Sequence, residues 1–381
     1  MEVHPMNRQE AMKQYLLENG EQIIADTVML AQHQSPTIRK EYVEKCADAI
    51  EALVKERLGL EPTAVYPQAE RGRHLYYRVG EGRPKALMIG HYDTVWNIDD
   101  LPLIRDGNKL SGPGVYDMKY GIVAGIWAIK AMLATGGLDG QLGLFFNSDE
   151  EMGSRTSRAH FEPIAKGFPN ALILEPAAPD GAVKVGRKST GDFLIKIHGI
   201  AAHAGTDYAT GRSAILEAAY LTQELFTMTD LPNGTSVNVG VISGGTKFNV
   251  IAAYAEMKVD VRVTKVAEGQ RMEKAIAALK PKQDGVTLEI SGGMNRPPFE
   301  FTEANQGLYA KAKEAAAELG IDLGKITVGG GSDGNFTSSW GIPTLDGLGP
   351  VGDGAHAAKE HLMVAESLEH TAVLANLLCK L

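Results

Sequence analysis

Short apolar segments that alternate with helical ones constrain the fold of this chain more than any other feature. Four segments have the length and composition of buried strands: Leu75–Val79, Ala86–Ile89, Leu142–Phe146 and Ala171–Leu174. Helices are expected at 7–32, 37–58, 117–136, 154–168, 303–319 and 363–380. A further short strand is expected at Thr344-Leu345. Strands that alternate with helices predict an α/β fold whose sheet is covered on both faces.

The pattern changes between about residues 187 and 294. Strands are expected at Asp192–Ile200, Ser236–Ile242, Tyr254–Val263 and Val286–Ile290, and helices at 211–229 and 267–280. The order β-α-β-β-α-β matches the split βαβ, or ferredoxin-like, motif. We therefore predict that 187–294 is a domain inserted into an α/β domain formed by 1–186 and 295–381.

Composition excludes several classes of function. Of the 381 residues, 44% are hydrophobic and 22% charged, as in ordinary soluble proteins, and the net charge of −9 without a basic block argues against nucleic acid. The longest apolar run, Gly121 to Ile129, is too short to span a bilayer. Cys46 and Cys379 are too few for a disulfide framework or a thiolate metal site. No secretory pattern opens the sequence, so we expect a cytoplasmic protein.

A His-x-Asp pair follows the second apolar strand. Ala86–Ile89 runs into Gly90-His91-Tyr92-Asp93, and in extended chain His91 and Asp93 point to the same side. A carboxylate beside an imidazole can fix its tautomer while the other ring nitrogen binds a metal. A solvated loop histidine is the alternative reading of this pair.

Carboxylates follow the next elements. A Gly-Pro-Gly turn at 112–114 delivers Asp117 to the start of an apolar helix, where it is either an N-cap or a ligand. Asp149, Glu150 and Glu151 come directly after the strand Leu142–Phe146. Three consecutive carboxylates after a buried strand are unfavourable unless positive charge lies among them. A solvated acidic loop is the alternative.

Glu175 ends another strand, and His356 lies in the glycine-rich segment 352–361. In open α/β sheets, ligands bind beyond the carboxyl ends of the strands. These histidines and carboxylates should therefore gather at one edge of the sheet. Two imidazoles and three or four carboxylates suit two zinc-like ions that share one carboxylate, and the absence of sulfur ligands argues against an iron–sulfur site.

The chain resembles the M20 metallopeptidase family, most closely its glutamate carboxypeptidase branch. The resemblance covers nearly the whole chain and rests on GHYDTVW, GPGVYDMKYG, NSDEEMGS, LEP, HGIAAHAG, FNVI followed by DVR, GGGSD and GAHAAKEH. It implies a mixed-sheet di-zinc exopeptidase domain with an inserted ferredoxin-like α+β domain that serves as lid and dimerisation surface. A homodimer that acts on small peptides or N-acyl amino acids is therefore expected.

The resemblance also assigns roles residue by residue. It implies that His91 and Glu175 hold one zinc ion, that Glu151 and His356 hold the other, and that Asp117 bridges both. Asp93 would orient His91, and Glu150 would be the general base. The Asp117-Met118 peptide is expected to be cis. Nitrogen and oxygen ligands would also accept cobalt or manganese.

The inserted domain of the family supplies the remaining roles. His203 would stabilise the oxyanion, usually from the partner subunit, and Asn249 would assist it. Arg262 and Arg296 would bind the carboxylate of the substrate, because the guanidinium fork matches a carboxylate. From the residues alone, Arg262 could equally face solvent, Asn249 could be a turn residue and His203 a surface histidine.

We therefore expect a metal-dependent hydrolase that cleaves the amide bond to a C-terminal amino acid, with glutamate favoured. Within the family, a glutamate at the position of Glu175 accompanies carboxypeptidases and deacylases, whereas aspartate is typical of aminopeptidases. An N-acyl-amino-acid deacylase, including a desuccinylase, is the first alternative. A non-catalytic binding module is the second, although the intact ligand set with Glu150 argues against it.

Overall fold

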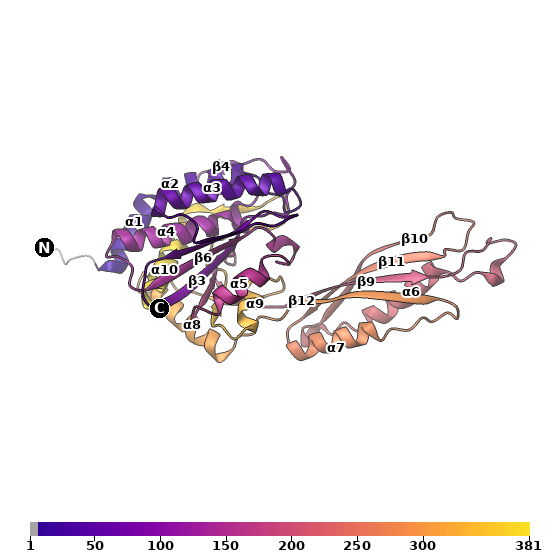
Figure 1. The fold of residues 1–381 in the computed structure, drawn as a ribbon. Helices are drawn as coiled ribbons and strands as arrows, with labels where there is room; N and C mark the ends of the chain where they lie inside the picture. Colours follow the sequence, from indigo (N-terminus) through magenta and orange to yellow (C-terminus); the bar gives the residue numbers. More distant parts are fainter. Residues whose placement is uncertain (1–6) are drawn as a thin grey trace. The chain divides into compact units, whose positions relative to one another are not determined.

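The computed structural model describes residues 7–381 and divides into two compact units (Figure 1). The first unit comprises the chain up to Gly186, Phe301–Thr327 and Ser332–Leu381; the second comprises Arg187–Glu300 and Val328–Gly331. The second unit reaches beyond the predicted end at 294 because Phe299 exchanges two backbone hydrogen bonds of 3.0 Å with Arg187. The amide of Lys188 in turn donates to the Val328 carbonyl at 3.1 Å, which places 328–331 in the same unit.

A six-stranded mixed sheet forms the centre of the first unit. Its strands lie in the order β1 (Ala64–Tyr66), β2 (His74–Val79), β6 (Gln141–Asn147), β3 (Pro84–His91), β7 (Ala171–Ile173) and β14 (Thr344–Leu345). The pairs β6–β3, β3–β7 and β7–β14 are parallel, whereas β1–β2 and β2–β6 are antiparallel. The predicted α/β class with a mixed sheet is thus confirmed, and the carboxyl ends of β3, β6 and β7 point the same way.

Helices cover both faces of this sheet. Ala86 and Met88 of β3 belong to one hydrophobic cluster, and the alternating Leu87 and Ile89 belong to another. The first cluster is closed by α1 (Arg8–Glu18), α2 (Gly20–Gln32), α3 (Lys40–Leu58), α4 (Tyr120–Ala134), α8 (Glu303–Ala317) and α10 (Val364–Lys380). The second is closed by α5 (Arg158–Ala165) and α9 (Gly334–Ser339), as Figure 1 shows. Burial on both faces explains why the strands read as continuous apolar runs.

The first predicted helix is in fact two helices. The sequence analysis gave a single helix over 7–32, but the chain breaks at Asn19 between α1 and α2. The side-chain Nδ2 of Asn19 donates to the Tyr15 carbonyl at 2.8 Å and its backbone N–H to the same carbonyl at 3.1 Å, which ends α1. A Cβ atom on Gly20 would lie only 2.8 Å from Leu368 Cδ1, so this turn packs closely against α10. That contact is long-range, but the dipeptide Asn19-Gly20 is itself typical of turns.

A small four-stranded sheet in the first unit was not predicted. It contains β15 (Gly352–Asp353), β16 (His361–Met363), β5 (Lys109–Ser111) and β4 (Ile104–Asp106), in that order. All its pairs are antiparallel, and the hairpin β15–β16 carries the loop with His356. Strands of two or three residues show no periodicity, which is why pattern reading misses them. A further two-stranded sheet pairs β8 (Val183–Arg187) with β13 (Lys325–Val328).

The second unit has the order β-α-β-β-α-β. Its elements are β9 (Ser189–His198), α6 (Ala214–Phe226), β10 (Ser236–Gly244), β11 (Tyr254–Val263), α7 (Val266–Ala277) and β12 (Thr287–Arg296). The sheet order is β10-β11-β9-β12, with all pairs antiparallel. Both helices pack on it through a hydrophobic core of its own that includes Ile195, Leu221 and Met272.

None of the helices within residues 7–381 combines the length and the apolar character needed to cross a membrane. The most apolar of them, α4, has 15 residues and is buried in the first unit.

Candidate metal centre

Seven residues of the candidate site belong to the first unit and follow the ends of its elements. His91 ends β3, and Asp93 lies two residues beyond it. Glu150 and Glu151 follow β6, Glu175 follows β7, Asp117 lies in the helical turn Val115–Lys119 before α4, and His356 lies between β15 and β16. Because β6, β3 and β7 are parallel neighbours, their carboxyl ends bring His91, the two glutamates of 150–151 and Glu175 to one edge of the sheet.

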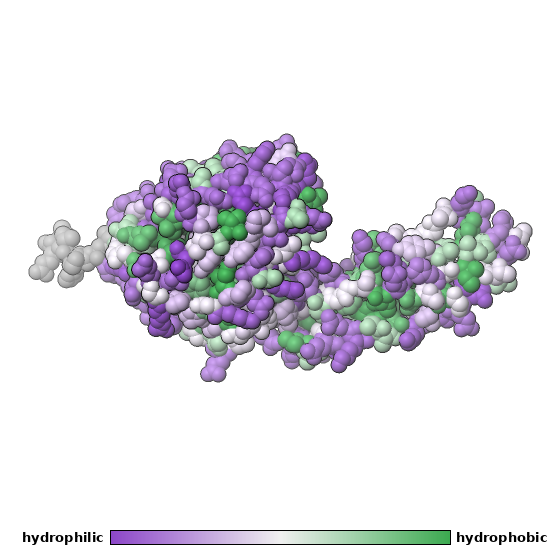
Figure 2. All heavy atoms as spheres, in the orientation of Figure 1, coloured by the Kyte–Doolittle hydropathy of each residue, from purple (hydrophilic) through white to green (hydrophobic). Residues whose placement is uncertain are grey.

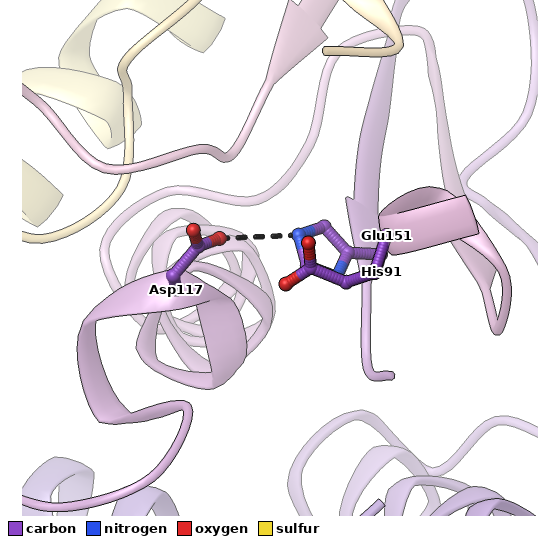
Figure 3. A group of neighbouring side chains, drawn as sticks. All are labelled: His91, Asp117 and Glu151. Atoms are coloured by element: carbon purple, nitrogen blue, oxygen red, sulfur yellow. Dashed lines mark hydrogen bonds and ion pairs between the residues drawn. The ribbon is translucent and has the colours of Figure 1, made fainter. Parts of the chain in front are cut away.

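Asp117 lies between the two histidines. Its Oδ1 is 3.2 Å from His91 Nε2, and its Oδ2 is 3.4 Å from His356 Nε2. Figure 3 shows the carboxylate of Asp117 directed at the His91 ring, with Glu151 beside it. Each oxygen of one carboxylate thus faces a different imidazole, which is the arrangement that a bridging ligand requires.

One further carboxylate joins each imidazole. Glu175 Oε1 lies 3.5 Å from His91 Nε2, and Glu151 Oε2 lies 3.0 Å from His356 Nε2. Ligand atoms about 2.0–2.1 Å from a tetrahedral zinc ion are separated by about 3.3–3.4 Å. The observed separations are close to that value. Two overlapping groups, His91–Asp117–Glu151 and His91–Glu150–Glu175, each gather their ligand atoms within 4.8 Å. The residues present therefore fit metal ions.

The carboxylates of the cluster create an environment that favours positive charge. Burial alone would lower the pKa of His91, but hydrogen bonds to Asp117, Asp93 and Glu175 raise it well above its usual value. Hydrogen bonds to Asp117 and Glu151 likewise raise the pKa of His356 to about 11. Burial raises the pKa of Glu151 to about 7, against the opposing effect of its hydrogen bond to His356. The carboxylates thus shift the pKa values of both imidazoles in the direction that favours positive charge, which a bound divalent cation would also provide.

Asp93 organises the acidic loop as well as His91. Its side chain is fully buried, and its Oδ1 and Oδ2 accept the backbone N–H groups of Glu150 and Glu151, each at 3.2 Å. Thr37 Oγ1 donates to the same carboxylate at 2.8 Å. The ring of His91 places Nδ1 3.0 Å from the Asp93 carbonyl, which leaves Nε2 toward Asp117. Asp93 therefore holds both the imidazole and the two glutamates.

Two buried carboxylates, Asp149 and Asp333, hold the acidic loop 147–154 in place, a role that the sequence analysis did not assign to them. Asp149 Oδ2 accepts from the amide and the hydroxyl of Thr156 at 2.6 and 2.8 Å. Asp333 Oδ2 accepts from Asn147 Nδ2 at 2.5 Å, and its Oδ1 accepts from the Ser154 hydroxyl. The motif GGGSD contains Asp333, so this motif was the available signal, but nothing local connected it to the loop 147–154.

The backbone has an unusual conformation at the turns that carry Asp117 and His356. The Asp117-Met118 peptide is cis, which confirms the expectation from the family resemblance. Gly114 has φ +71°, and a Cβ atom there would lie 2.8 Å from Thr94 Cγ2, so the turn before Asp117 requires glycine. His356 has φ +60°, a conformation that non-glycine residues rarely adopt outside functional or strongly constrained positions.

Comparison with known proteins decides the family. The sequence profile of peptidase family M20/M25/M40 matches residues 87–380, which is most of the chain and includes every residue of the candidate metal centre. The chain belongs to this family. As a member of family M20, it is a hydrolase, and the gathered histidines and carboxylates are those of a metal-dependent one.

Two curated M20 relatives are similar in sequence. Carboxypeptidase G2 of Pseudomonas sp. (strain RS-16) is 29% identical over 291 residues, which cover 74% of this chain and 69% of the relative. Succinyl-diaminopimelate desuccinylase of Thioalkalivibrio sulfidiphilus is 27% identical over 382 residues, covering 93% of this chain and all of the relative. Carboxypeptidase and desuccinylase activities thus both occur among similar proteins.

Solved M20 structures share the fold at low identity. A tripeptidase from Staphylococcus aureus has a TM-score of 0.74 and 19% identity, covering 94% of this chain and 98% of that one. An M20 family metallo-carboxypeptidase from Sulfolobus solfataricus has a TM-score of 0.71 and 15% identity, covering 94% and 99%. These likenesses establish the fold.

The four remaining residues predicted from M20 motifs belong to the second unit. His203 and Asn249 lie on neighbouring exposed loops, since the amide of Ala204 donates to the Asn249 carbonyl at 3.1 Å. His203 Nδ1 accepts from the amides of Gly205 and Thr206 at 3.0 and 3.2 Å. The neutral ring therefore carries its proton on Nε2.

The two arginines differ in surroundings. Arg262 is one-third exposed and its Nε donates to both oxygens of Asp260 at 2.9 Å, because residues two apart on β11 share a face. Arg296 ends β12 and is buried, paired in register with Thr190 of β9. A substrate carboxylate at Arg262 would have to compete with Asp260.

Proposed function

We propose that this M20 hydrolase cleaves the amide bond to a C-terminal amino acid, with glutamate preferred. The observation that carries the proposal is the placement of Asp117, whose two oxygens face His91 and His356 at 3.2 and 3.4 Å. Such a shared carboxylate suits a pair of metal ions rather than a single one. The similarity to carboxypeptidase G2 supports the choice of substrate class.

In this proposal, His91 and Glu175 hold one zinc ion, His356 and Glu151 hold the other, and Asp117 bridges them. Cobalt or manganese would suit the same ligands. When bound, such ions supply positive charge that makes water more acidic and polarises a carbonyl group. Every ligand is a nitrogen or oxygen atom on a different segment of the chain, so the folded sheet edge brings the set together.

Glu150 is the proposed general base. It lies with His91 and Glu175 at the site, and its backbone is held by Asp93. Its carboxylate accepts a proton from the attacking water while the water oxygen bonds to the scissile carbonyl carbon. Glu150 then returns that proton to the amine nitrogen as the carbon–nitrogen bond breaks. Asp93 is a positioning residue, because it touches His91, Glu150 and Glu151 rather than the substrate.

His203 is the proposed donor to the oxyanion. Its Nδ1 is already occupied by two backbone amides, so Nε2–H remains as the donor. Asn249, on the neighbouring loop, would assist. Arg262 and Arg296 remain the proposed partners for the carboxylate of the substrate. Arg262 would then have to give up its ion pair with Asp260 to bind the substrate.

A homodimer formed through the second unit is proposed as well. Helix α6 buries Ala218 and Leu221. Its residues Ile215, Leu216 and Tyr220 are 48%, 42% and 40% exposed. The edge strand β10 exposes Val241 and Ile242 by 49% and 48%. Figure 2 shows hydrophobic residues gathered at the surface of this unit. A second copy would cover this apolar surface and the unpaired strand edge.

Removal of a succinyl group is the second candidate activity. It is favoured by the desuccinylase of Thioalkalivibrio sulfidiphilus, which aligns with this chain over its whole length. The test is to incubate the zinc-loaded protein separately with an N-acyl-glutamate and with N-succinyl-diaminopimelate, with and without chelator. Chelator-sensitive release of glutamate supports the carboxypeptidase activity. Cleavage of only the succinyl substrate favours the desuccinylase, and absence of both reactions contradicts the proposed function.

A further inference from the structure

Glu360 lies at the meeting point of three segments that carry proposed metal ligands. Its side chain is 1% exposed. Oε1 accepts from the backbone N–H groups of Tyr116 and Asp117, both at 3.1 Å. Oε2 accepts from the indole N–H of Trp96 at 2.5 Å. The first two donors belong to the turn of Asp117, and Trp96 belongs to the segment that begins at His91.

Glu360 also shares a loop with His356. This loop joins β15 to β16 and is closed internally, since the Ala357 amide donates to the Gly354 carbonyl at 2.9 Å and the Glu360 amide donates to the Ala357 carbonyl at 2.8 Å. The carboxylate of Glu360 therefore links the His356 loop to the Asp117 turn, beside a backbone hydrogen bond from the Gly112 N–H to the Glu360 carbonyl at 3.3 Å. The 3.4 Å separation of His356 Nε2 and Asp117 Oδ2 spans the same two segments.

Burial of a carboxylate is unfavourable unless hydrogen bonds compensate for lost water. Here all three hydrogen-bond donors to the carboxylate belong to segments that carry proposed metal ligands. Removal of a group that hydrogen-bonds and orients a metal ligand typically weakens metal binding by about 10- to 100-fold.

We propose that Glu360 is a positioning residue of the metal centre, which holds Asp117 and His356 at the separation that a shared metal site requires. The proposal rests on the proposed metal centre. It adds a residue that acts through the ligands and does not itself contact metal or substrate.

The hydrogen-bond pattern gives a sharp substitution test. Glu360→Gln keeps the shape but converts one acceptor oxygen into an N–H₂ donor. Whichever way the amide is turned, a donor then faces either the two backbone amides or the Trp96 indole. Trp96→Phe removes the indole donor, so the amide oxygen of Gln at position 360 can accept from the backbone. The second substitution should therefore recover part of what the first one loses.

The experiment measures Zn²⁺ affinity by chelator competition and the absorption spectrum of bound Co²⁺, which reports ligand geometry. Glu360→Gln and Glu360→Ala should each bind Zn²⁺ at least about tenfold more weakly than the parent and alter the Co²⁺ spectrum. Adding Trp96→Phe to Glu360→Gln should restore part of the affinity. Glu366→Gln is the matched control and should bind like the parent, because Glu366 is exposed in the first turn of α10, where its carboxylate accepts from Asn108 Nδ2 at 2.8 Å.

Parent-like affinity and spectrum in the Glu360 variants would overturn the proposal, as would a Trp96→Phe substitution that restores nothing. Glu360→Ala provides the comparison if Glu360→Gln does not fold, because it removes the carboxylate without adding a donor. A parent protein that binds no zinc would contradict the metal centre itself. If the parent binds zinc and the Glu360 variants bind it with the same affinity, only the role of Glu360 is contradicted.

Discussion

Asp117 Oδ1 lies 3.2 Å from Nε2 of His91, although the two residues belong to different segments of the chain, 26 residues apart. The second oxygen of the same carboxylate is turned toward His356. The position of Asp117 therefore couples the two halves of the proposed metal centre, and substitutions at the ligands should not have equal effects.

Asp117→Asn should remove most of the bound zinc, because both ions share this carboxylate, whereas Glu175→Gln should weaken only the ion held with His91. Zinc content after gel filtration measures this: about two ions per chain in the parent, about one in Glu175→Gln and fewer in Asp117→Asn. Asp353→Asn is the control, since Asp353 pairs with Lys359 instead. Equal zinc loss in both ligand variants would argue against a shared carboxylate.

Glu150→Gln should keep its zinc and lose about 10²- to 10⁴-fold in turnover, because the amide can hold the position but cannot accept the proton. Zinc content and the rate of amide hydrolysis are measured on the same preparation. Glu162→Gln, on the surface of α5 beside Lys166, should leave both unchanged. Zinc loss in Glu150→Gln would instead make Glu150 a ligand, as its grouping with His91 and Glu175 also permits.

A mixture of Glu150→Gln and His203→Ala proteins should recover part of the activity that each has lost, if His203 serves the site of the partner subunit. Each mixed dimer then contains one site with both residues intact. Subunit exchange is verified by native mass spectrometry of differently tagged chains. With exchange demonstrated, a mixture that remains inactive would show that His203 does not act across the dimer.

His74 should make the folded protein less stable as the pH falls. Burial lowers the pKa of His74 to about 4 from 6.5, so between these values the unfolded chain binds a proton that the folded chain does not. The free energy of unfolding should therefore fall as the pH drops from 6.5 toward 4.

Urea unfolding of the metal-free protein at several pH values measures this effect. His74→Gln, which can still hydrogen-bond Ser148 and Thr156, should lose less stability than the parent over that range. His198→Gln, at an exposed histidine of β9, should follow the parent. Identical pH profiles for the parent and His74→Gln would contradict the low pKa.

Much of the fold of the first unit follows from local patterns. The runs around Ala86–Ile89 and Leu142–Phe146 are apolar on both faces, and such runs mark the centre of a covered sheet. The prediction of a single helix misses the break at Asn19-Gly20, although this dipeptide is typical of turns and the Asn19 side chain ends α1 locally through Tyr15. The short strands β4, β5, β15 and β16 exist only through their pairing, so no local periodicity announces them.

The site divides in the same way. Proposed ligands such as His91 and Glu175 follow strands, and a strand end can be read from the sequence. The residues that hold them act over long distances: Glu360 accepts from Trp96 across 264 positions, and Asp333 accepts from Asn147 across 186. Carboxylates of this kind resemble ordinary loop residues until the tertiary structure shows which backbone groups they face.

The most direct test of the proposed function is a competition assay read by mass spectrometry. The zinc-loaded protein is given an equimolar pool of N-acyl amino acids and dipeptides that differ only at the C-terminal residue, with Glu150→Gln as the control. We predict preferential release of glutamate by the parent and none by the variant. Preferential release of apolar or aromatic residues would contradict the glutamate preference and favour a deacylase, and absence of any release by zinc-loaded parent would contradict the hydrolytic function itself.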